Sequence, residues 1–156
     1  AHCRRFNRDC KGYQMTVIYN RQYEQLLWAA QRVDVEKFRP DAWAIGNERD
    51  GKLVAVAVFD GFSDTDCNVH LASDGTARWN TREFIARAMY YPFIQMNLRR
   101  LTGLVPAGNE RALRFNQHFG FKIEGVHREA GADGSDIISM GLLRRECRWI
   151  PMEYRK

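Results

Sequence analysis

The most informative part of this sequence is the stretch Asn109-Glu-Arg-Ala-Leu-Arg-Phe-Asn-Gln-His-Phe-Gly-Phe121. Asn109 can cap the free amides at the start of a helix, and Gly120 can take the left-handed conformation that ends one. Apolar residues between them recur at helical spacing, and the run Phe-Lys-Ile-Glu-Gly-Val from Phe121 is typical of a strand. The stretch therefore predicts a short helix that stops at a glycine and turns directly into a strand.

The residues around that turn resemble the C-terminal signature of the GNAT superfamily of acetyl-CoA-dependent N-acetyltransferases. In the signature, Asn-x-x-Ala/Ser leads to Gly-Phe and then to Glu-Gly or a similar pair. The matching places are occupied here by Asn109, Ala112, Gly120, Phe121 and Gly125. The resemblance implies the GNAT fold and the transfer of an acetyl group from acetyl-CoA to an amine.

Residue patterns elsewhere predict the order strand, helix, three strands, helix, strand, helix, two strands. The strands are expected at residues 12–19, 42–49, 52–59, 66–72, 100–105, 121–128 and 137–143. A hairpin at Asp50-Gly51 alternates with helical crossovers, which gives an α+β fold. We expect a mixed, mostly antiparallel central sheet of about seven strands flanked by helices. This is also the GNAT order, and the resemblance spans roughly residues 13–146.

Two of the predicted helices have distinctive features. The first follows Asn20 as its cap, with an apolar stripe of Tyr23, Leu26, Leu27, Ala30 and Val33. The second, over residues 80–96, would begin with a capping box of Asn80 and Glu83. Pro92 must kink this helix or cut its last turn short.

The composition is that of an ordinary globular domain. The chain has 156 residues, of which 45% are hydrophobic and 28% charged, so we expect a single domain over residues 1–156. No stretch approaches the roughly 20 apolar residues of a membrane span, and the first residues lack the apolar core of a signal peptide. We therefore expect a cytoplasmic protein without a membrane partner, a monomer or a homodimer. The segment 139–149 resembles the tail of acetyltransferases encoded by tailed phages. If the protein is phage-encoded, its expected location is the cytoplasm of the host cell.

The cysteine spacing does not favour a metal site, and the charge distribution only weakly favours a nucleic-acid partner. Cys3 and Cys10 form one loose pair, whereas zinc sites use paired close spacings, so we expect reduced thiols and no metal. The net charge is +5, and arginines gather near both ends of the chain. Such ends can contact nucleic acid, an acidic protein or cofactor phosphates, but a solvated basic face is more common.

The resemblance implies where acetyl-CoA would bind. In the superfamily the fourth strand bends away from the fifth, and the pantetheine amides pair with its exposed backbone. By element order this backbone belongs here to Leu71 and Ala72. The alternative is an ordinary paired strand. The family also places the pyrophosphate at the start of the next helix, where free amides and the helix dipole favour negative charge.

The phosphate-binding loop departs from the family pattern Gln/Arg-x-x-Gly-x-Gly/Ala. Residues 76–81 occupy this motif, with Trp79 and Thr81 where glycines are expected. Arg78, Arg82 and the Thr81 hydroxyl can compensate by contacting phosphate directly, and Trp79 would lie over the cofactor or close the loop. The predicted cofactor-binding residues of this loop are Ala77, Arg78, Trp79, Asn80 and Thr81. A collapsed loop that no longer binds acetyl-CoA is the alternative.

The expected acid for the departing thiolate is also altered. The family often has a tyrosine one position after the aromatic at Phe115, and this position is Asn116. An amide can hydrogen-bond the sulfur but does not donate a proton readily, so a water would supply the proton. Phe115 and Asn109 are expected to border the pantetheine arm. The alternative is that Asn109 only caps its helix.

For the base, alternation along residues 66–72 puts Asp66, Asn68, His70 and Ala72 on one face of the strand. His70 lies where the family often places its base or a water-holding residue, and histidine titrates near neutral pH. Asp66 and Glu124 are weaker candidates.

Two functions therefore follow from the sequence. The first is an N-acetyltransferase that moves an acetyl group from acetyl-CoA to an amine of a small molecule or protein by direct nucleophilic attack. The second is a catalytically degenerate GNAT scaffold that acts as a binding or inhibitor protein for a protein or nucleic-acid partner. The missing glycines and the missing tyrosine favour this alternative.

Overall fold

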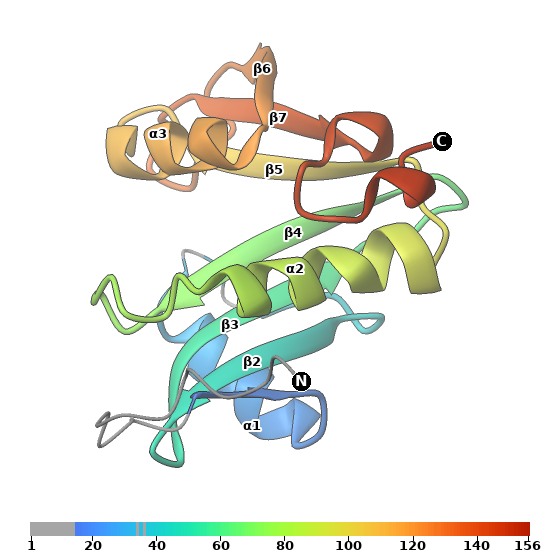
Figure 1. The fold of residues 1–156 in the computed structure, drawn as a ribbon. Helices are drawn as coiled ribbons and strands as arrows, with labels where there is room; N and C mark the ends of the chain where they lie inside the picture. Colours follow the sequence, from blue (N-terminus) through green and yellow to red (C-terminus); the bar gives the residue numbers. More distant parts are fainter. Residues whose placement is uncertain (1–14, 34, 36) are drawn as a thin grey trace, which may run out of the picture.

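The computed structural model describes residues 15–33, 35 and 37–156, and Figure 1 shows their arrangement. Its regular elements are β1 (Met15–Ile18), α1 (Gln22–Ala30), β2 (Trp43–Arg49), β3 (Lys52–Asp60), β4 (Asp66–Ser73), α2 (Arg82–Tyr90), β5 (Arg100–Pro106), α3 (Glu110–Phe119), β6 (Lys122–His127) and β7 (Ile137–Leu143). This order confirms the predicted one. The first residues of the first predicted strand, 12–14, lie outside the described residues, as do Cys3 and Cys10.

The strands form one seven-stranded sheet in the spatial order β1-β2-β3-β4-β5-β7-β6. All neighbouring strands are antiparallel except β4 and β5, which are parallel. Helix α1 covers one face of the sheet, where Ala29 packs among residues of β2, β3 and β4. Helices α2 and α3 cover the other face and close the larger core (Figure 1). The predicted α+β fold with a mixed, mostly antiparallel sheet is therefore confirmed.

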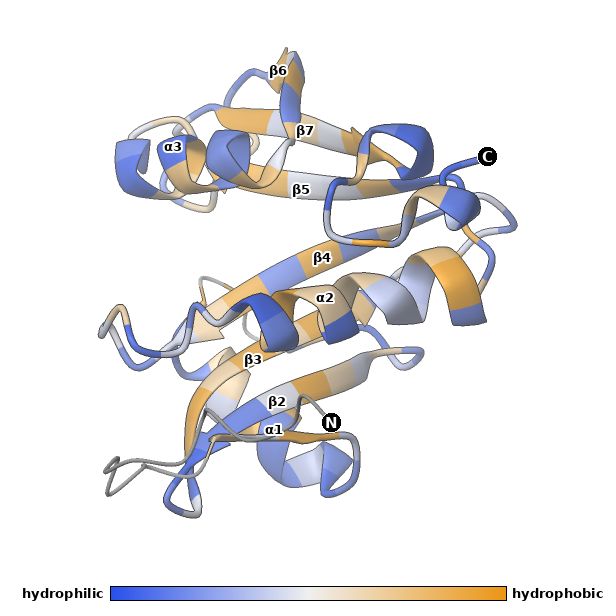
Figure 2. Cartoon of the chain, in the orientation of Figure 1, coloured by the Kyte–Doolittle hydropathy of each residue, from blue (hydrophilic) through white to orange (hydrophobic). Residues whose placement is uncertain are grey.

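Strand β3 is buried on both faces because it lies inside the sheet. Val56 and Val58 face α1, whereas Ala57 and Phe59 face the core beneath α2. Its mostly hydrophobic colour in Figure 2 reflects this position. The hairpin that leads into β3 turns at Asp50 and Gly51, both at positive φ (52° and 75°), as a tight two-residue turn requires.

The helix-to-strand turn that the sequence predicts most strongly is present. The Asn109 side chain accepts a hydrogen bond from the Ala112 amide at 3.0 Å and so caps α3. Gly120 ends the helix with a left-handed φ of 105°, and the Phe121 amide donates to the Asn116 carbonyl at 3.0 Å. Phe121 itself is buried, and β6 begins at the next residue.

The prediction for the face and the cap of α1 was wrong. The helix is preceded by Arg21 in the left-handed conformation, with no side-chain cap. Gln25 is fully buried, whereas Tyr23 and Leu27 are 82% and 50% exposed. The buried glutamine is tolerated because its side-chain amide donates to the Asn20 carbonyl, so tertiary contacts outweigh the apolar stripe.

The cap of helix α2 lies one residue later than predicted, and the regular helix stops before Pro92, as expected of a proline at this place. Its cap is Thr81, whose hydroxyl accepts from the Phe84 amide at 3.2 Å, and not Asn80. Glu83 therefore makes no capping box and pairs instead with Arg87 at 3.1 Å. The last predicted turn, around Pro92, is a π-helical segment, Tyr91–Gln95, since proline lacks the amide that a regular helix needs there.

None of the described helices is long and apolar enough to cross a bilayer. Two described cysteines, Cys67 and Cys147, are free thiols in the core. Burial raises the pKa of both, which keeps them protonated and unreactive. In the described part of the chain, no three His, Cys, Asp or Glu side chains are grouped so that they could hold a metal ion.

Candidate active site

Strands β4 and β5 are joined at one end and separate at the other. Their parallel pairing covers only Asp66–Asn68 of β4 and Arg100–Thr102 of β5. Beyond this point β4 continues beside β3 as far as Ser73, and β5 continues beside β7 as far as Pro106. The edges that β4 and β5 turn toward each other are therefore unpaired over the rest of their length (Figure 1). Backbone donors and acceptors along such an opening can bind an extended ligand that carries amides.

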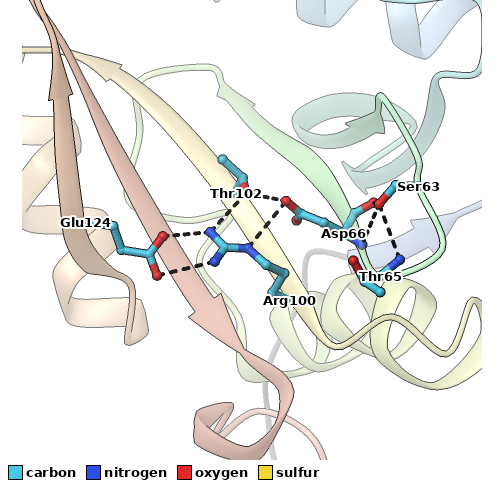
Figure 3. Close-up of polar contacts among 6 residues, drawn as sticks. All are labelled: Ser63, Thr65, Asp66, Arg100, Thr102 and Glu124. Atoms are coloured by element: carbon cyan, nitrogen blue, oxygen red, sulfur yellow. Dashed lines mark hydrogen bonds and ion pairs between the residues drawn. The ribbon is translucent and has the colours of Figure 1, made fainter.

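The joined end is held by side chains as well as by the backbone (Figure 3). Thr102 on β5 donates its hydroxyl proton to Asp66 on β4 at 2.7 Å. Arg100 lies between two carboxylates, with Nε 3.4 Å from Asp66 and Nη2 2.7 Å from Glu124 on β6. These contacts connect strands on both sides of the opening and fix the point from which β4 and β5 diverge.

A bulge in β6 brings Glu124 to this network. The register between β6 and β7 shifts between Ile123 and Gly125, so Glu124 is the extra residue. Its carboxylate lies flat over Gly141 of β7, where a Cβ would collide with Glu124 Oε1. Asp66 and Glu124, which the sequence offered as weaker candidates for the base, are thus both paired with Arg100.

His70 lies just beyond the joined end and is oriented by Asp60 of β3. His70 Nε2 is 3.1 Å from Asp60 Oδ1, and the Arg39 amide donates to the other carboxylate oxygen at 3.2 Å. The Asp60 side chain is 5% exposed and that of His70 is 22% exposed. An ionised carboxylate can only accept, so Nε2 carries the proton and the Nδ1 lone pair is left available. The ring of Phe38 packs edge-on against the imidazole, with centroids 5.3 Å apart.

Asn116 lies on the opposite face of the sheet from His70. Its Nδ2 is 3.8 Å from the sulfur of Met140, and a Cβ on Gly103 would be 3.6 Å from the same nitrogen. Gly103 is the first residue of β5 beyond the joined end. By alternation, His70 shares its face with Ala72, which packs under α1, whereas Met140 belongs to the core beneath α2 and α3. The opening between the strands therefore has a histidine on one side and an amide on the other.

The loop before α2 is attached to the core by Trp79. The indole is 6% exposed and contacts the rings of Phe84 and Phe115, at centroid distances of 6.2 and 5.3 Å. Its carbonyl accepts from the buried Asn47 amide at 3.0 Å. Of the two roles predicted for Trp79, closing the loop agrees with this burial, and little of the ring remains for a ligand. Phe115 is likewise committed to ring contacts.

The other predicted loop residues are accessible. Ala77, Arg78 and Asn80 are exposed beside the start of α2. The Thr81 hydroxyl accepts the capping hydrogen bond but still has a proton to donate. Leu71 and Ala72 pair with β3 but lie on the part of β4 that is not paired with β5. The structure thus gathers these residues along β4 and the loop that follows it, with Trp79 and Phe115 turned into the core.

Sequence reasoning missed the partner of His70 and the role of Arg100. Asp60 directly follows the apolar run of β3, and a carboxylate in so buried a strand is unusual enough to be a signal. The position of Arg100 between two carboxylates could be found only from the register of β4, β5 and β6.

Several solved structures of N-acetyltransferases have a similar fold. A mutant of the spermidine N-acetyltransferase SpeG from Vibrio cholerae is 20% identical with a TM-score of 0.60, over 67% of this chain and 65% of that one. Mutant forms of the spermidine/spermine N-acetyltransferase SpeG from the same organism match with 15% identity and a TM-score of 0.69, over 83% and 94% of the two chains. The N-acetyltransferase PseH from Campylobacter jejuni is 16% identical with a TM-score of 0.55, over 67% and 70%.

The chain spans slightly less than two thirds of the first SpeG chain and nearly all of the second. No family model matches the sequence, and no curated protein does either. At these identities the likeness establishes a GNAT-like fold and nothing finer.

Proposed function

We propose that this protein is an N-acetyltransferase that moves an acetyl group from acetyl-CoA to an amine by direct attack. The observation that carries the proposal is the opening between β4 and β5, with His70 on one face and Asn116 on the other. Acetyl-CoA would enter this opening from the α2–α3 face and place its thioester between the strands. The amine would approach the thioester from the α1 face. The shared fold of the N-acetyltransferases SpeG and PseH supports the same reaction class.

In this proposal the unpaired backbone of β4 holds the donor. The amides of the pantetheine arm would pair with backbone groups near Leu71 and Ala72, as a neighbouring strand otherwise would. Within the described part of the chain, the side-chain NH₂ group of Asn109 makes no hydrogen bond, and Asn109 would border the same arm. Phosphates would lie at the start of α2, beside Arg78 and the Thr81 hydroxyl, where the helix dipole favours negative charge.

The chemical step needs a base for the amine and a proton for the thiolate. The amine nitrogen attacks the thioester carbonyl, and the proton that it loses passes to Nδ1 of His70. The carbon–sulfur bond then breaks, and the thiolate takes a proton from water. The side-chain amide of Asn116 would donate a hydrogen bond to the departing sulfur. The products are an N-acetyl amide and the free thiol of coenzyme A.

Isothermal titration with acetyl-CoA is the direct test of this proposal. We expect binding at micromolar to millimolar ligand, and the absence of any heat at millimolar acetyl-CoA would contradict it. The first acceptor for a thiol-release assay is spermidine, because SpeG is named a spermidine N-acetyltransferase. Other small amines and lysine-containing peptides follow. Because the chain has four cysteines of its own, each thiol-release assay needs a control without acceptor.

The second candidate, a binding protein on a GNAT scaffold, is favoured by one observation. Trp79 fills the place of a family glycine and ties the phosphate loop to the core. If this loop is closed to acetyl-CoA, titration gives no heat, and binding to a protein or nucleic-acid partner should depend on the basic ends of the chain. The cytoplasmic location and the phage origin expected from the sequence remain part of the proposal.

A further inference from the structure

A hollow on the surface joins the start of α2 to the C-terminal segment of the chain. Its volume is about 430 Å³, and its lining residues are Asn80, Arg82, His118, Arg148 and Trp149. It lies beside the loop that ends at Thr81, on the side of α3 away from Asn116. The lining holds two guanidinium groups, an imidazole and an indole, and no carboxylate.

The wall that the C-terminal segment contributes is firmly built. Cys147 and Ile150 are buried on either side of Arg148 and Trp149. The Trp149 indole stacks on Phe119 with centroids 5.1 Å apart, and its Nε1 donates to the Phe119 carbonyl at 3.0 Å. This fixes the indole at the edge of the hollow.

The cations of the hollow differ in how they are held. Arg148 donates to the His118 carbonyl and lies over the Trp149 ring, with Cζ 4.8 Å from its centroid. Arg82 is exposed and, within the described part of the chain, has no hydrogen bond or ion pair. A free guanidinium beside a stacked guanidinium–indole pair suits a ligand with both phosphate and a flat ring.

A larger hollow, of about 810 Å³, lies at the turn between β6 and β7 but has no such character. Its lining combines Arg128 with Glu129 and Asp136, and Asp136 already accepts from the Glu129 amide at 2.9 Å. His127 is its only ring, and an arginine beside two carboxylates selects no ligand class.

We propose that the hollow formed by Arg82, His118, Arg148 and Trp149 binds the 3′-phosphoadenosine end of the acyl donor. This inference rests on the proposed function. The phosphates of the donor would reach the hollow from the start of α2, with Arg82 and Arg148 on the ribose 3′-phosphate. The adenine packs against the flat Arg148–Trp149 pair. For the basic C-terminal end, the sequence offered cofactor phosphates as one of several partners, and in this inference it becomes part of the donor site.

Titration calorimetry with coenzyme A and with 3′-dephospho-coenzyme A tests the inference. The wild-type protein should bind coenzyme A about tenfold more tightly, because charge-assisted contacts to the 3′-phosphate are lost in the other ligand. In Arg82→Ala and Arg148→Ala this difference should shrink to about twofold or less, mainly through weaker binding of coenzyme A.

Arg32→Ala is the matched control. Arg32 also donates to a carbonyl and lies over an indole, 3.8 Å from the Trp28 centroid, but it lies just after α1 and is not among the residues that line the hollow. This variant should keep the full difference between the two ligands. If Arg148→Ala fails to fold, Arg82→Ala decides the result alone, because Arg82 makes no bond in the described structure. The inference is overturned, and the proposed function left standing, if the Arg82 variant binds coenzyme A and still prefers it to 3′-dephospho-coenzyme A by the wild-type factor. Failure of the wild type to bind coenzyme A at all would overturn both.

Discussion

The two ends of the β4–β5 pair differ in what their side chains do. At the joined end, Thr102 and Arg100 on β5 both contact Asp66 on β4. At the open end, in the part of the chain that the structure describes, no side chain of Val69–Ser73 is bonded to one of residues 103–106. The joined end thus contributes stability, and the open end is left accessible for a ligand. Substitutions at the open end should change activity and binding, whereas those at the joined end should change the free energy of unfolding.

The largest effect is expected at the open end, from His70→Ala. Loss of the base should lower kcat by about 10² to 10³-fold near neutral pH, with a smaller change in the binding of acetyl-CoA. The measurement is steady-state turnover with the best acceptor between about pH 6 and pH 9. His127→Ala, an exposed histidine of β6, is the control and should keep full activity. Equal turnover in the His70 variant over this pH range would remove His70 from the mechanism.

A somewhat smaller effect is expected from Asp60→Asn. An asparagine amide can donate to His70 Nε2, which would move the ring proton to Nδ1 and block the lone pair that accepts the proton of the amine. We expect kcat to fall by about tenfold to 10²-fold while the variant stays folded. NMR of the imidazole nitrogens would report the tautomer directly. If His70 keeps its proton on Nε2 and kcat still falls, the orientation argument is wrong.

Gly103 tests whether the opening itself accepts the donor. A Cβ at this position meets Asn116 and Phe121 at ordinary contact distances of 3.6 and 3.8 Å, so Gly103→Ala should be tolerated. The two further methyl groups of Gly103→Val would displace Asn116 and narrow the opening. We expect the Kd for acetyl-CoA to rise by about tenfold in the valine variant and by less than about twofold in the alanine variant. Equal affinities in both variants would place the donor elsewhere.

The joined end should respond in the opposite way. Arg100→Met keeps the aliphatic stem but leaves Asp66 and Glu124 without their shared cation. We expect a loss of about 1 kcal/mol in the free energy of unfolding, since Arg100 is about one third exposed and solvent screens the pair. The measurement is urea denaturation. Arg114→Met, which removes a surface pair with Glu110, is the control, with a loss of about 0.3 kcal/mol. This division of roles would be contradicted if Arg100→Met lost more free energy of acetyl-CoA binding than free energy of unfolding.

The parts of this site that the sequence predicted depend on neighbours in the chain. The cap at Asn109 and the left-handed Gly120 follow from local chemistry, and so does the Asp50–Gly51 hairpin. The histidine was found because alternation along one strand decides which face a residue takes. These predictions needed no knowledge of how strands align.

The parts that were missed depend on the alignment of different strands. Asp60 meets His70 only because β3 and β4 pair with Val58 opposite His70. Glu124 reaches Arg100 only because a bulge in β6 adds one residue. Neither register is encoded in the local pattern, and a shift by one residue would turn each side chain to the other face. The buried Gln25 in α1 was missed for a related reason, since its partner is a loop carbonyl outside the helix.

The smallest expected effect concerns the turn that leads from β3 into the joined end. Asp41 accepts hydrogen bonds from the Gly61 and Phe62 amides at 2.9 and 2.8 Å. These bonds lower the pKa of the Asp41 carboxyl below its ordinary value. The folded state therefore favours the ionised form, and the stabilisation is complete above the ordinary aspartate value of about 3.9. It is lost as the pH falls through the lower value of the folded state.

Asp41→Asn should accordingly destabilise the protein by only about 0.5 kcal/mol near neutral pH, because the carboxylate is exposed to solvent. The difference from the wild type should shrink as the pH is lowered to about 3 and below. Urea denaturation of both proteins at the two pH values measures it. Asp64→Asn removes an exposed carboxylate of the same turn and should show no difference at either pH. A gap between wild type and Asp41→Asn that stays constant with pH would mean that ionisation of Asp41 does not hold this turn. A change in acetyl-CoA affinity would mean that the turn belongs functionally to the open end and not to the joined one.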